Sequence, residues 1–179
     1  MKKLFLTLVV AIMSVTAGAQ VYVGGEASLW RNWDENETQF TLAPEIGYTL
    51  SDDWSIGTTI GYIHNYDKGV KTNGFQIAPY ARYTFARTGI VSFFLDGGFD
   101  FATYKAKANG HSSDALNAWG IGIKPGVKVS VAKNIDFIAH VGFLGYRDHD
   151  DELNLPATSK GLGFSLKSTD LQFGLIYNF

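Results

Sequence analysis

The stretch LAPEIGYTLSDDWSIGTTIGY, residues 42–62, alternates in polarity with a period of two on both sides of a short polar turn. From Leu42 to Leu50 every second residue is apolar or aromatic, and a similar spacing resumes from Trp54 to Tyr62. The residues between them are small or polar, with Glu45 among them. Because successive side chains of a strand point to opposite faces, this pattern predicts a β-hairpin with one apolar face and one small, polar face.

The same hairpin pattern recurs twice further along the chain, in residues 77–99 (IAPYARYTFARTGIVSFFLDGGF) and 123–143 (IKPGVKVSVAKNIDFIAHVGF). Each repeat begins with an apolar residue, any residue and proline, and its second strand ends with glycine and an aromatic residue. In the third hairpin we expect the apolar face to extend to Phe143. A first strand over 21–30 and a last one ending at Phe179 bring the predicted number of strands to eight.

The connections between the predicted strands alternate in length. Those at 51–53, 86–89 and 132–134 are tight, whereas those at 31–38, 64–74, 105–117 and 147–169 are longer and rich in Gly, Asn, Asp, Lys and Ser. Short turns at one end and long polar loops at the other are typical of outer-membrane barrels, whose turns face the periplasm. We therefore predict an all-β fold, an eight-stranded antiparallel transmembrane β-barrel in an up-and-down meander.

A soluble barrel would also alternate, but its apolar face would point inward. Here the apolar face carries large side chains and the opposite face is crowded with glycine, and a narrow eight-stranded interior favours the small residues. Aromatic residues also fall into two bands, as at the two surfaces of a bilayer. The predicted interface residues are Tyr48, Trp54, Tyr83, Phe85, Tyr177 and Phe179 near the turns, and Tyr62 and Trp119 near the loops, with Phe40, Phe75, Phe101 and Phe143 in the second band.

The N-terminus has the features of a secretory signal peptide. Lys2 and Lys3 precede the apolar run LFLTLVVAIMSV, which is shorter than a membrane-spanning helix, and small residues follow at 17–19. We predict that residues 1–19 are a cleaved signal peptide and that the barrel domain covers residues 20–179. The chain has 179 residues, no cysteine and a net charge of -2, which gives no electrostatic case for binding nucleic acid.

The last strand, LQFGLIYNF, alternates and ends on Phe179. With the sequences PEIGYT (44–49) and PYARYT (79–84) in the repeated hairpins, the chain resembles the small OmpA/OmpX-type eight-stranded outer-membrane barrels, and in particular the "outer membrane protein beta-barrel" family of Bacteroidetes-like bacteria. The resemblance implies the bacterial outer membrane as the location. It also implies outer-membrane lipid, lipopolysaccharide and the barrel assembly machinery as partners, the last through the strand ending at Phe179. We expect a monomer.

The face opposite the apolar one carries charges of both signs, which the alternation places inside the barrel. Buried charges must be paired or hydrated, because leaving one alone costs several kcal/mol. We predict an ion-pair network that plugs the lumen, and we keep a narrow polar channel for small solutes as the alternative. The predicted network consists of Glu26, Glu45, Arg82, Asp96, Asp100, Lys124, Lys128, Asp136 and His140.

Catalysis is a further alternative, since some small outer-membrane barrels are similar to hydrolases acting on lipid A. The stretch GHSSDALN contains His111, Ser113 and Asp114, which would suit a nucleophilic serine with its base and acid. A polar loop with one histidine is the ordinary interpretation, and we expect no enzymatic activity and no cofactor.

The stretch RDHDDELN is rich in carboxylates, which are the ligands that Ca²⁺ prefers. The weak metal-binding candidates are Asp148, Asp150, Asp151 and Glu152. Their spacing matches no defined calcium loop, and a solvated acidic surface is the ordinary interpretation of such a run.

Three prolines, Pro44, Pro79 and Pro125, fall on the predicted lipid-facing side of their strands. Proline cannot donate a hydrogen bond, and a closed barrel has no free edge to accommodate it. We therefore predict β-bulges at these positions, or carbonyls satisfied by lumen water. The function predicted from the whole pattern is an integral outer-membrane protein with a structural or surface-interaction role, in adhesion or envelope integrity.

Overall fold

The computed structural model describes residues 21–33, 36–67, 69–108, 111–150, 160–166 and 171–179. These residues form antiparallel strands, and none of them lies in a helix long and apolar enough to cross a membrane. The strands are β1 (Val21–Asn32), β2 (Glu37–Thr49), β3 (Trp54–Asp67), β4 (Val70–Thr88), β5 (Val91–Ala108), β6 (His111–Ser112), β7 (Leu116–Ala132), β8 (Ile135–Val141), β9 (Phe143–His149), β10 (Gly161–Ser165) and β11 (Leu171–Asn178).

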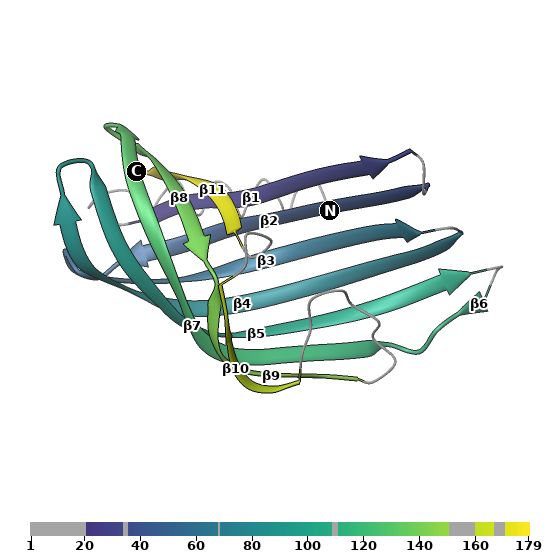
Figure 1. Ribbon diagram of the computed structural model, residues 1–179. Coiled ribbons are helices and arrows are strands. Elements are labelled where there is room, and N and C mark those ends of the chain that lie inside the picture. The colour runs from purple at the N-terminus through teal and green to yellow at the C-terminus, as the bar shows by residue number, and fades with distance from the viewer. Residues whose placement is uncertain (1–20, 34–35, 68, 109–110, 151–159, 167–170) are drawn as a thin grey trace.

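Eight of these strands close into a barrel, which confirms the predicted fold. The ring runs β1, β2, β3, β4, β5, β7, β8 and β11, and β11 returns to pair with β1 (Figure 1). Closure rests on four residue pairs, from Tyr22 opposite Asn178 to Gly25 opposite Leu175. We call the end of the barrel that holds the tight turns near residues 51–53, 89–90 and 133–134 the turn end, and the other end the loop end.

The remaining strands extend the ring toward the loop end. β6 pairs with the end of β5, β9 continues β8 and pairs with β7, and β10 pairs with β9. The break between β8 and β9 falls at Gly142, whose φ of +74° suits glycine and strains any other residue. The register of β7 shifts by one residue there, from Gly126 opposite His140 to Ile123 opposite Leu144.

This shift overturns one expectation. The alternation carried through from Ile135 predicts that Phe143 faces lipid, but its side chain is buried in the lumen, with 7% of its surface exposed. A one-residue slip moves every later side chain of a strand to the opposite face. Leu144 and Tyr146 therefore face outward in its place, and both are exposed.

The three prolines behave differently from one another. The register between β2 and β3 is the same before and after Pro44, and the register between β4 and β5 is the same before and after Pro79, so the predicted bulges are absent there. Each ladder lacks only the residue pairs at the proline itself and the residue before it. Beside Pro125 the partner strand contains the irregularity at Gly142, as the bulge prediction requires. Proline thus removes single ladder bonds in two strands and accompanies a break in the third.

The strands run further toward the loop end than the sequence predicts. The composition of residues 64–74 predicts a loop, yet β3 continues to Asp67 and β4 begins at Val70. Polar cross-strand contacts support this extension, because His64 Nδ1 lies 2.7 Å from Asn73 Oδ1. At 14 and 19 residues, β3 and β4 are longer than the roughly 9–11 residues that cross a bilayer.

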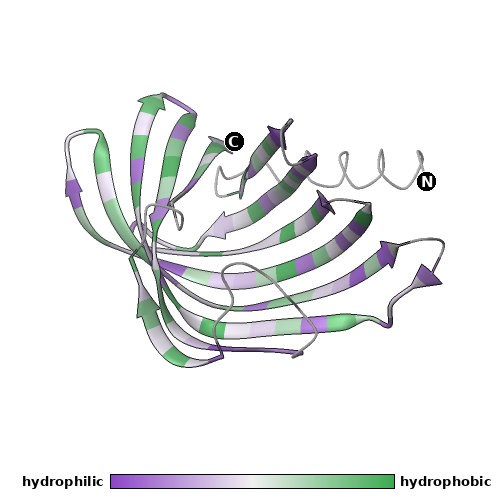
Figure 2. Ribbon diagram, turned by 45° about the vertical axis from the view of Figure 1, so that its right-hand side comes forward, coloured by the Kyte–Doolittle hydropathy of each residue, from purple (hydrophilic) through white to green (hydrophobic). Residues whose placement is uncertain are grey.

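The two faces of the wall differ as the alternation predicts. Ile46, Ile56, Ile77 and their neighbours of the same parity point outward, and the hydropathy colouring alternates along the strands and turns hydrophilic toward the loop end (Figure 2). The predicted interface aromatics Tyr48, Trp54, Tyr62, Tyr83, Phe85, Trp119 and Tyr177 are exposed, and Phe179 is half-buried. Trp54 and Tyr83 lie with ring centroids 4.8 Å apart.

Candidate functional site in the barrel lumen

Arg82 of β4 is the central residue of a charged cluster in the lumen. Its Nε donates to Asp96 Oδ1 at 2.7 Å and its Nη2 to Asp96 Oδ2 at 2.8 Å, a bidentate pair across neighbouring strands. The same Nη2 also reaches Glu45 Oε1 on β2, at 3.4 Å. All three side chains are about 95% buried, so each charge depends on the others for compensation.

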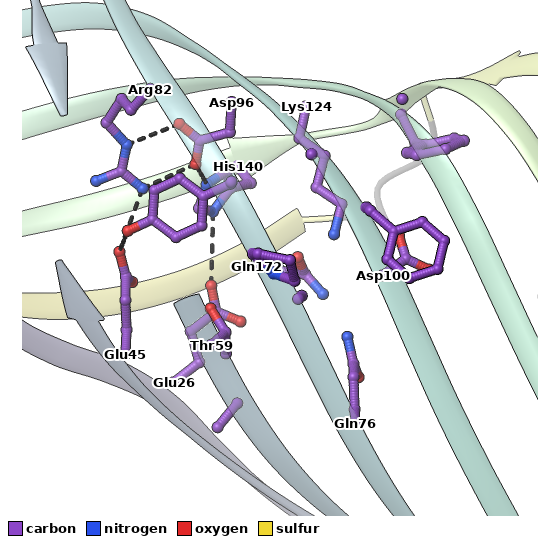
Figure 3. A pocket seen from close by; sticks show the side chains of 18 of the residues that line it. Glu26, Glu45, Thr59, Gln76, Arg82, Asp96, Asp100, Lys124, His140 and Gln172 are labelled. Carbon is purple, nitrogen blue, oxygen red and sulfur yellow. Dashed lines mark hydrogen bonds and ion pairs between the residues drawn. The ribbon is translucent and has the colours of Figure 1, made fainter. Parts of the chain in front are cut away.

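His140 of β8 extends this cluster across the barrel. Its Nε2 lies 2.8 Å from Asp96 Oδ2, and its Nδ1 lies 3.6 Å from Glu26 Oε1 on β1 (Figure 3). Nδ1 is buried and has no hydrogen-bond partner within the described residues. Five strands, β1, β2, β4, β5 and β8, therefore contribute to one charged cluster, which we call the lumen cluster: Glu26, Glu45, Arg82, Asp96 and His140.

Aromatic rings pack around the guanidinium of Arg82. Its Cζ lies 4.3 Å from the ring centroid of Phe94 and 5.0 Å from that of Tyr80. The hydroxyl of Tyr80 bonds to Glu45 and lies 2.7 Å from the hydroxyl of Tyr22. Phe94 also packs edge-on against His140, with centroids 5.3 Å apart. The rings pack against the guanidinium, whose side chain is only 5% exposed.

Each of four lumen aromatics covers a glycine directly opposite it on the neighbouring strand. The pairs are Tyr22 with Gly47, Tyr80 with Gly57, Phe94 with Gly126 and Tyr104 with Gly74. A Cβ built on any of these glycines would overlap the facing ring. The lumen glycines therefore provide the space into which the aromatic rings fold, which is how a narrow barrel holds large side chains.

A second, smaller network lies toward the turn end. Lys128 Nζ lies 3.7 Å from Asp136 Oδ2. Asp136 also accepts hydrogen bonds from Ser130 Oγ at 2.7 Å and from Asn178 Nδ2 at 2.9 Å. These contacts connect β7, β8 and the C-terminal strand β11 close to where the barrel closes.

A cavity of about 120 Å³ lies beside the lumen cluster. Gln76, Asp100, Lys124 and Gln172 line it together with members of the cluster (Figure 3). Lys124 stands opposite Asp96 in the register of β5 and β7, but the Asp96 oxygens are occupied by Arg82 and His140. Within the described part of the chain neither Lys124 nor Asp100 forms an ion pair, so the structure does not join these two predicted members to the network.

The residues considered for catalysis lie at the loop end, in and after β6. The Ser113 hydroxyl donates to the Asp114 carbonyl oxygen at 2.8 Å and accepts from the Ala106 N–H at 3.0 Å. His111, Ser113 and Asp114 are all exposed. The serine hydroxyl is engaged with the backbone, as in a turn, and its proton does not point to a base.

The acidic candidates for metal binding are only partly within the described chain, because Asp151 and Glu152 lie outside it. Asp148 Oδ1 lies 3.7 Å from Lys160 Nζ and accepts the His149 N–H at 2.8 Å. Asp150 accepts the Asn117 N–H at 2.7 Å. The described residues contain no cluster of three or more metal-ligating side chains.

The lumen also contains aromatic residues that the alternation of charges and glycines does not predict. Tyr22, Tyr80, Phe94 and Tyr104 share the parity of the glycines and charges, where the width of an eight-stranded barrel predicts small or charged residues. The signal that could have found them is register: each lies opposite a glycine once the tight turns are fixed.

Comparisons with known proteins agree with this architecture. A family model described as "Outer membrane protein beta-barrel domain" matches residues 4–179. The N-terminal β-barrel domain of OprF from Pseudomonas aeruginosa is 17% identical, with a TM-score of 0.54, over 90% of this chain and 98% of that chain. Neisserial surface protein A (NspA) is 17% identical, with a TM-score of 0.51, over 91% of this chain and 98% of that one.

A major outer membrane protein from Thermus thermophilus is 11% identical, with a TM-score of 0.55, over 90% of this chain and 100% of that chain. At these identities the likeness concerns the fold. No curated protein is significantly similar to the chain in sequence.

Proposed function

The chain belongs to the outer membrane protein beta-barrel domain family, and from this premise we propose that it is a structural, non-enzymatic protein of the bacterial outer membrane with a plugged lumen. Its turn end faces the periplasm and its loop end faces outward, where the loops serve as a surface for interaction. The single observation that supports the plug is the lumen cluster, in which Arg82 pairs with Glu45 and Asp96, and His140 links Asp96 to Glu26, so that five strands are joined.

The plug follows from the energetics of the cluster. A channel wall holds hydrated charges apart, whereas here Arg82 is enclosed by two carboxylates and two aromatic rings. Opening a water path would move Arg82 away from Asp96 and Glu45, and would give up their charge-assisted hydrogen bonds and the packing of side chains that are about 95% buried. The closed state is therefore the stable one.

We expect the purified protein to show no conductance steps in planar bilayers. The double variant Arg82→Ala, Phe94→Ala removes the centre of the plug and should introduce conductance. The matched variant Lys124→Gln changes a charge of the cavity that lies outside the lumen cluster. Conductance steps in the unmodified protein that shrink in Lys124→Gln would instead support the narrow pore, which the half-buried Lys124 and Asp100 of the cavity favour.

The proposed orientation is tested by cysteine labelling, since the chain has no cysteine of its own. Asp67 is exposed at the loop end and Thr88 at the turn end. A membrane-impermeant maleimide added to intact cells is expected to label Asp67→Cys and not Thr88→Cys, with both labelled after lysis. Labelling of Thr88→Cys in intact cells would reverse the orientation.

The structural role predicts that deletion of the gene raises the sensitivity of the cells to detergent and that the unmodified gene restores resistance. Lipid A is expected to keep its mass when the protein is overproduced. A change in lipid A mass that disappears in Ser113→Ala and His111→Ala would replace this proposal with a hydrolase.

A further inference from the structure

Three lysines lie together on the outward face of the wall at the loop end. Lys71 of β4 stands directly opposite Lys107 of β5, and Lys105 stands two pairs further down on the same face, opposite Asn73. Their side chains have the parity of Phe75 and Phe101, which point away from the lumen and are exposed. We call Lys71, Lys105 and Lys107 the lysine patch.

The lysine patch has no counter-charge of its own. All three side chains are exposed, and within the described residues none has a carboxylate at ion-pairing distance. Like charges directly opposite each other destabilise a strand pair, so the facing pair of Lys71 and Lys107 is unfavourable without a bound anion. On β9 the outward charge is instead Asp148, which Lys160 neutralises.

Neighbouring polar groups add hydrogen-bond donors to the patch. The Asn73 Oδ1 atom accepts the Tyr62 hydroxyl at 2.9 Å and lies 2.7 Å from His64 Nδ1. These contacts fix the amide group with its Nδ2 hydrogens available beside Lys105. Ammonium groups and an oriented amide are suitable donors for phosphate oxygens.

The height of the patch on the barrel matches the headgroup region of a bilayer. Phe75 and Phe101 belong to the aromatic band at the loop end. Lys71 and Lys105 each lie four residues closer to the loop end on the same strands, which is roughly 13 Å along the strand at 3.3 Å per residue. Figure 2 shows that hydrophilic residues become more frequent along the wall toward the loop end. A cationic patch just outside an aromatic band faces lipid phosphates.

We propose that the lysine patch binds the phosphate groups of the outer-leaflet glycolipid, so that one side of the barrel carries a docking site for lipid A. The inference rests on the orientation proposed above, which puts the loop end in the outer leaflet. The acyl chains then lie against the apolar wall of β4 and β5 below the patch, and the phosphates reach the three ammonium groups. The lysine patch binds the lipid and catalyses no reaction.

The test measures lipid binding to the folded protein in detergent micelles, where orientation plays no part. The probes are diphosphoryl lipid A, the same lipid A with both phosphates removed, and inorganic phosphate, titrated in native mass spectrometry. The unmodified protein is expected to bind diphosphoryl lipid A about tenfold or more tightly than the dephosphorylated form, and this preference should fall as salt is raised.

The double variant Lys71→Gln, Lys107→Gln is expected to lose this preference. Its charge-matched control is Arg87→Gln, Lys133→Gln, at the turn end, where both side chains are exposed, and this control should keep it. Equal binding of both lipids by the unmodified protein, or an unchanged preference in the Lys71→Gln, Lys107→Gln variant, would overturn the proposal. If inorganic phosphate binds the protein as tightly as lipid A does, the proposal that the ligand is a lipid would also be overturned. If the proposed orientation of the barrel in the membrane is wrong, the cysteine labelling shows this independently of lipid binding.

Discussion

Arg82→Met is expected to lower the free energy of unfolding by about 3–5 kcal/mol, because it leaves Glu45 and Asp96 buried without their cation. Methionine keeps much of the volume of the side chain, so the loss reports charge and hydrogen bonding more than a cavity. The measurement is urea-induced unfolding in lipid vesicles, followed by tryptophan fluorescence and by the mobility of the unheated protein on a gel.

Arg87→Met is the matched control. Arg87 also pairs with an aspartate, Asp53, at 2.7 Å, but these side chains are 43% and 52% exposed. An exposed pair contributes only about 0–1 kcal/mol, so this variant should stay near the unmodified protein. Equal losses of unfolding free energy in Arg82→Met and Arg87→Met would show that the burial of the ion pair does not determine how much stability is lost.

The triple variant Arg82→Met, Glu45→Gln, Asp96→Asn separates charge from packing. Neutral amides in place of the carboxylates remove the uncompensated charges, and we expect most of the stability lost in Arg82→Met to return. A triple variant as unstable as the single one would mean that Arg82 acts through its contacts with Tyr80 and Phe94 rather than through its charge.

The alternation of residues 42–62 was sufficient to predict which wall faces are apolar, because a two-residue period maps directly onto two faces. It also placed Glu45 inside the barrel, and the same alternation in residues 77–99 placed Arg82 there. The alternation did not identify which cation of the predicted network pairs with Glu45, because that pairing depends on how the strands stagger around the ring, which is a property of the closed barrel and not of any one strand.

The break at Gly142 shows the limit of reasoning from periodicity. In the sequence, Val141, Gly142 and Phe143 continue the alternation, and nothing in that pattern reveals that Gly142 adopts a φ of +74°. Glycine allows such a conformation without requiring it. The face of Phe143 could therefore be decided only from the register of β9 with β7.

Gly126→Val is expected to cost about 1–3 kcal/mol, because its side chain would overlap the ring of Phe94 in a closely packed lumen. Phe94 is fully buried and is held between Arg82 and His140, so it cannot move aside. Unfolding in vesicles, measured as for Arg82→Met, gives the loss of stability.

The control is Gly97→Val, a glycine on the outward face of β5 with no atom within 4 Å of an added Cβ. There the change should stay within about 0.5 kcal/mol, as is usual for surface substitutions.

Phe94→Leu provides the second half of the test, since a smaller side chain opens the space that valine needs. If the glycine exists to admit the ring, Gly126→Val together with Phe94→Leu is less destabilising than the sum of the two single changes, with a coupling of about 0.5–3 kcal/mol. Additive losses would mean that Gly126 serves the backbone of β7 and that its pairing with Phe94 is incidental.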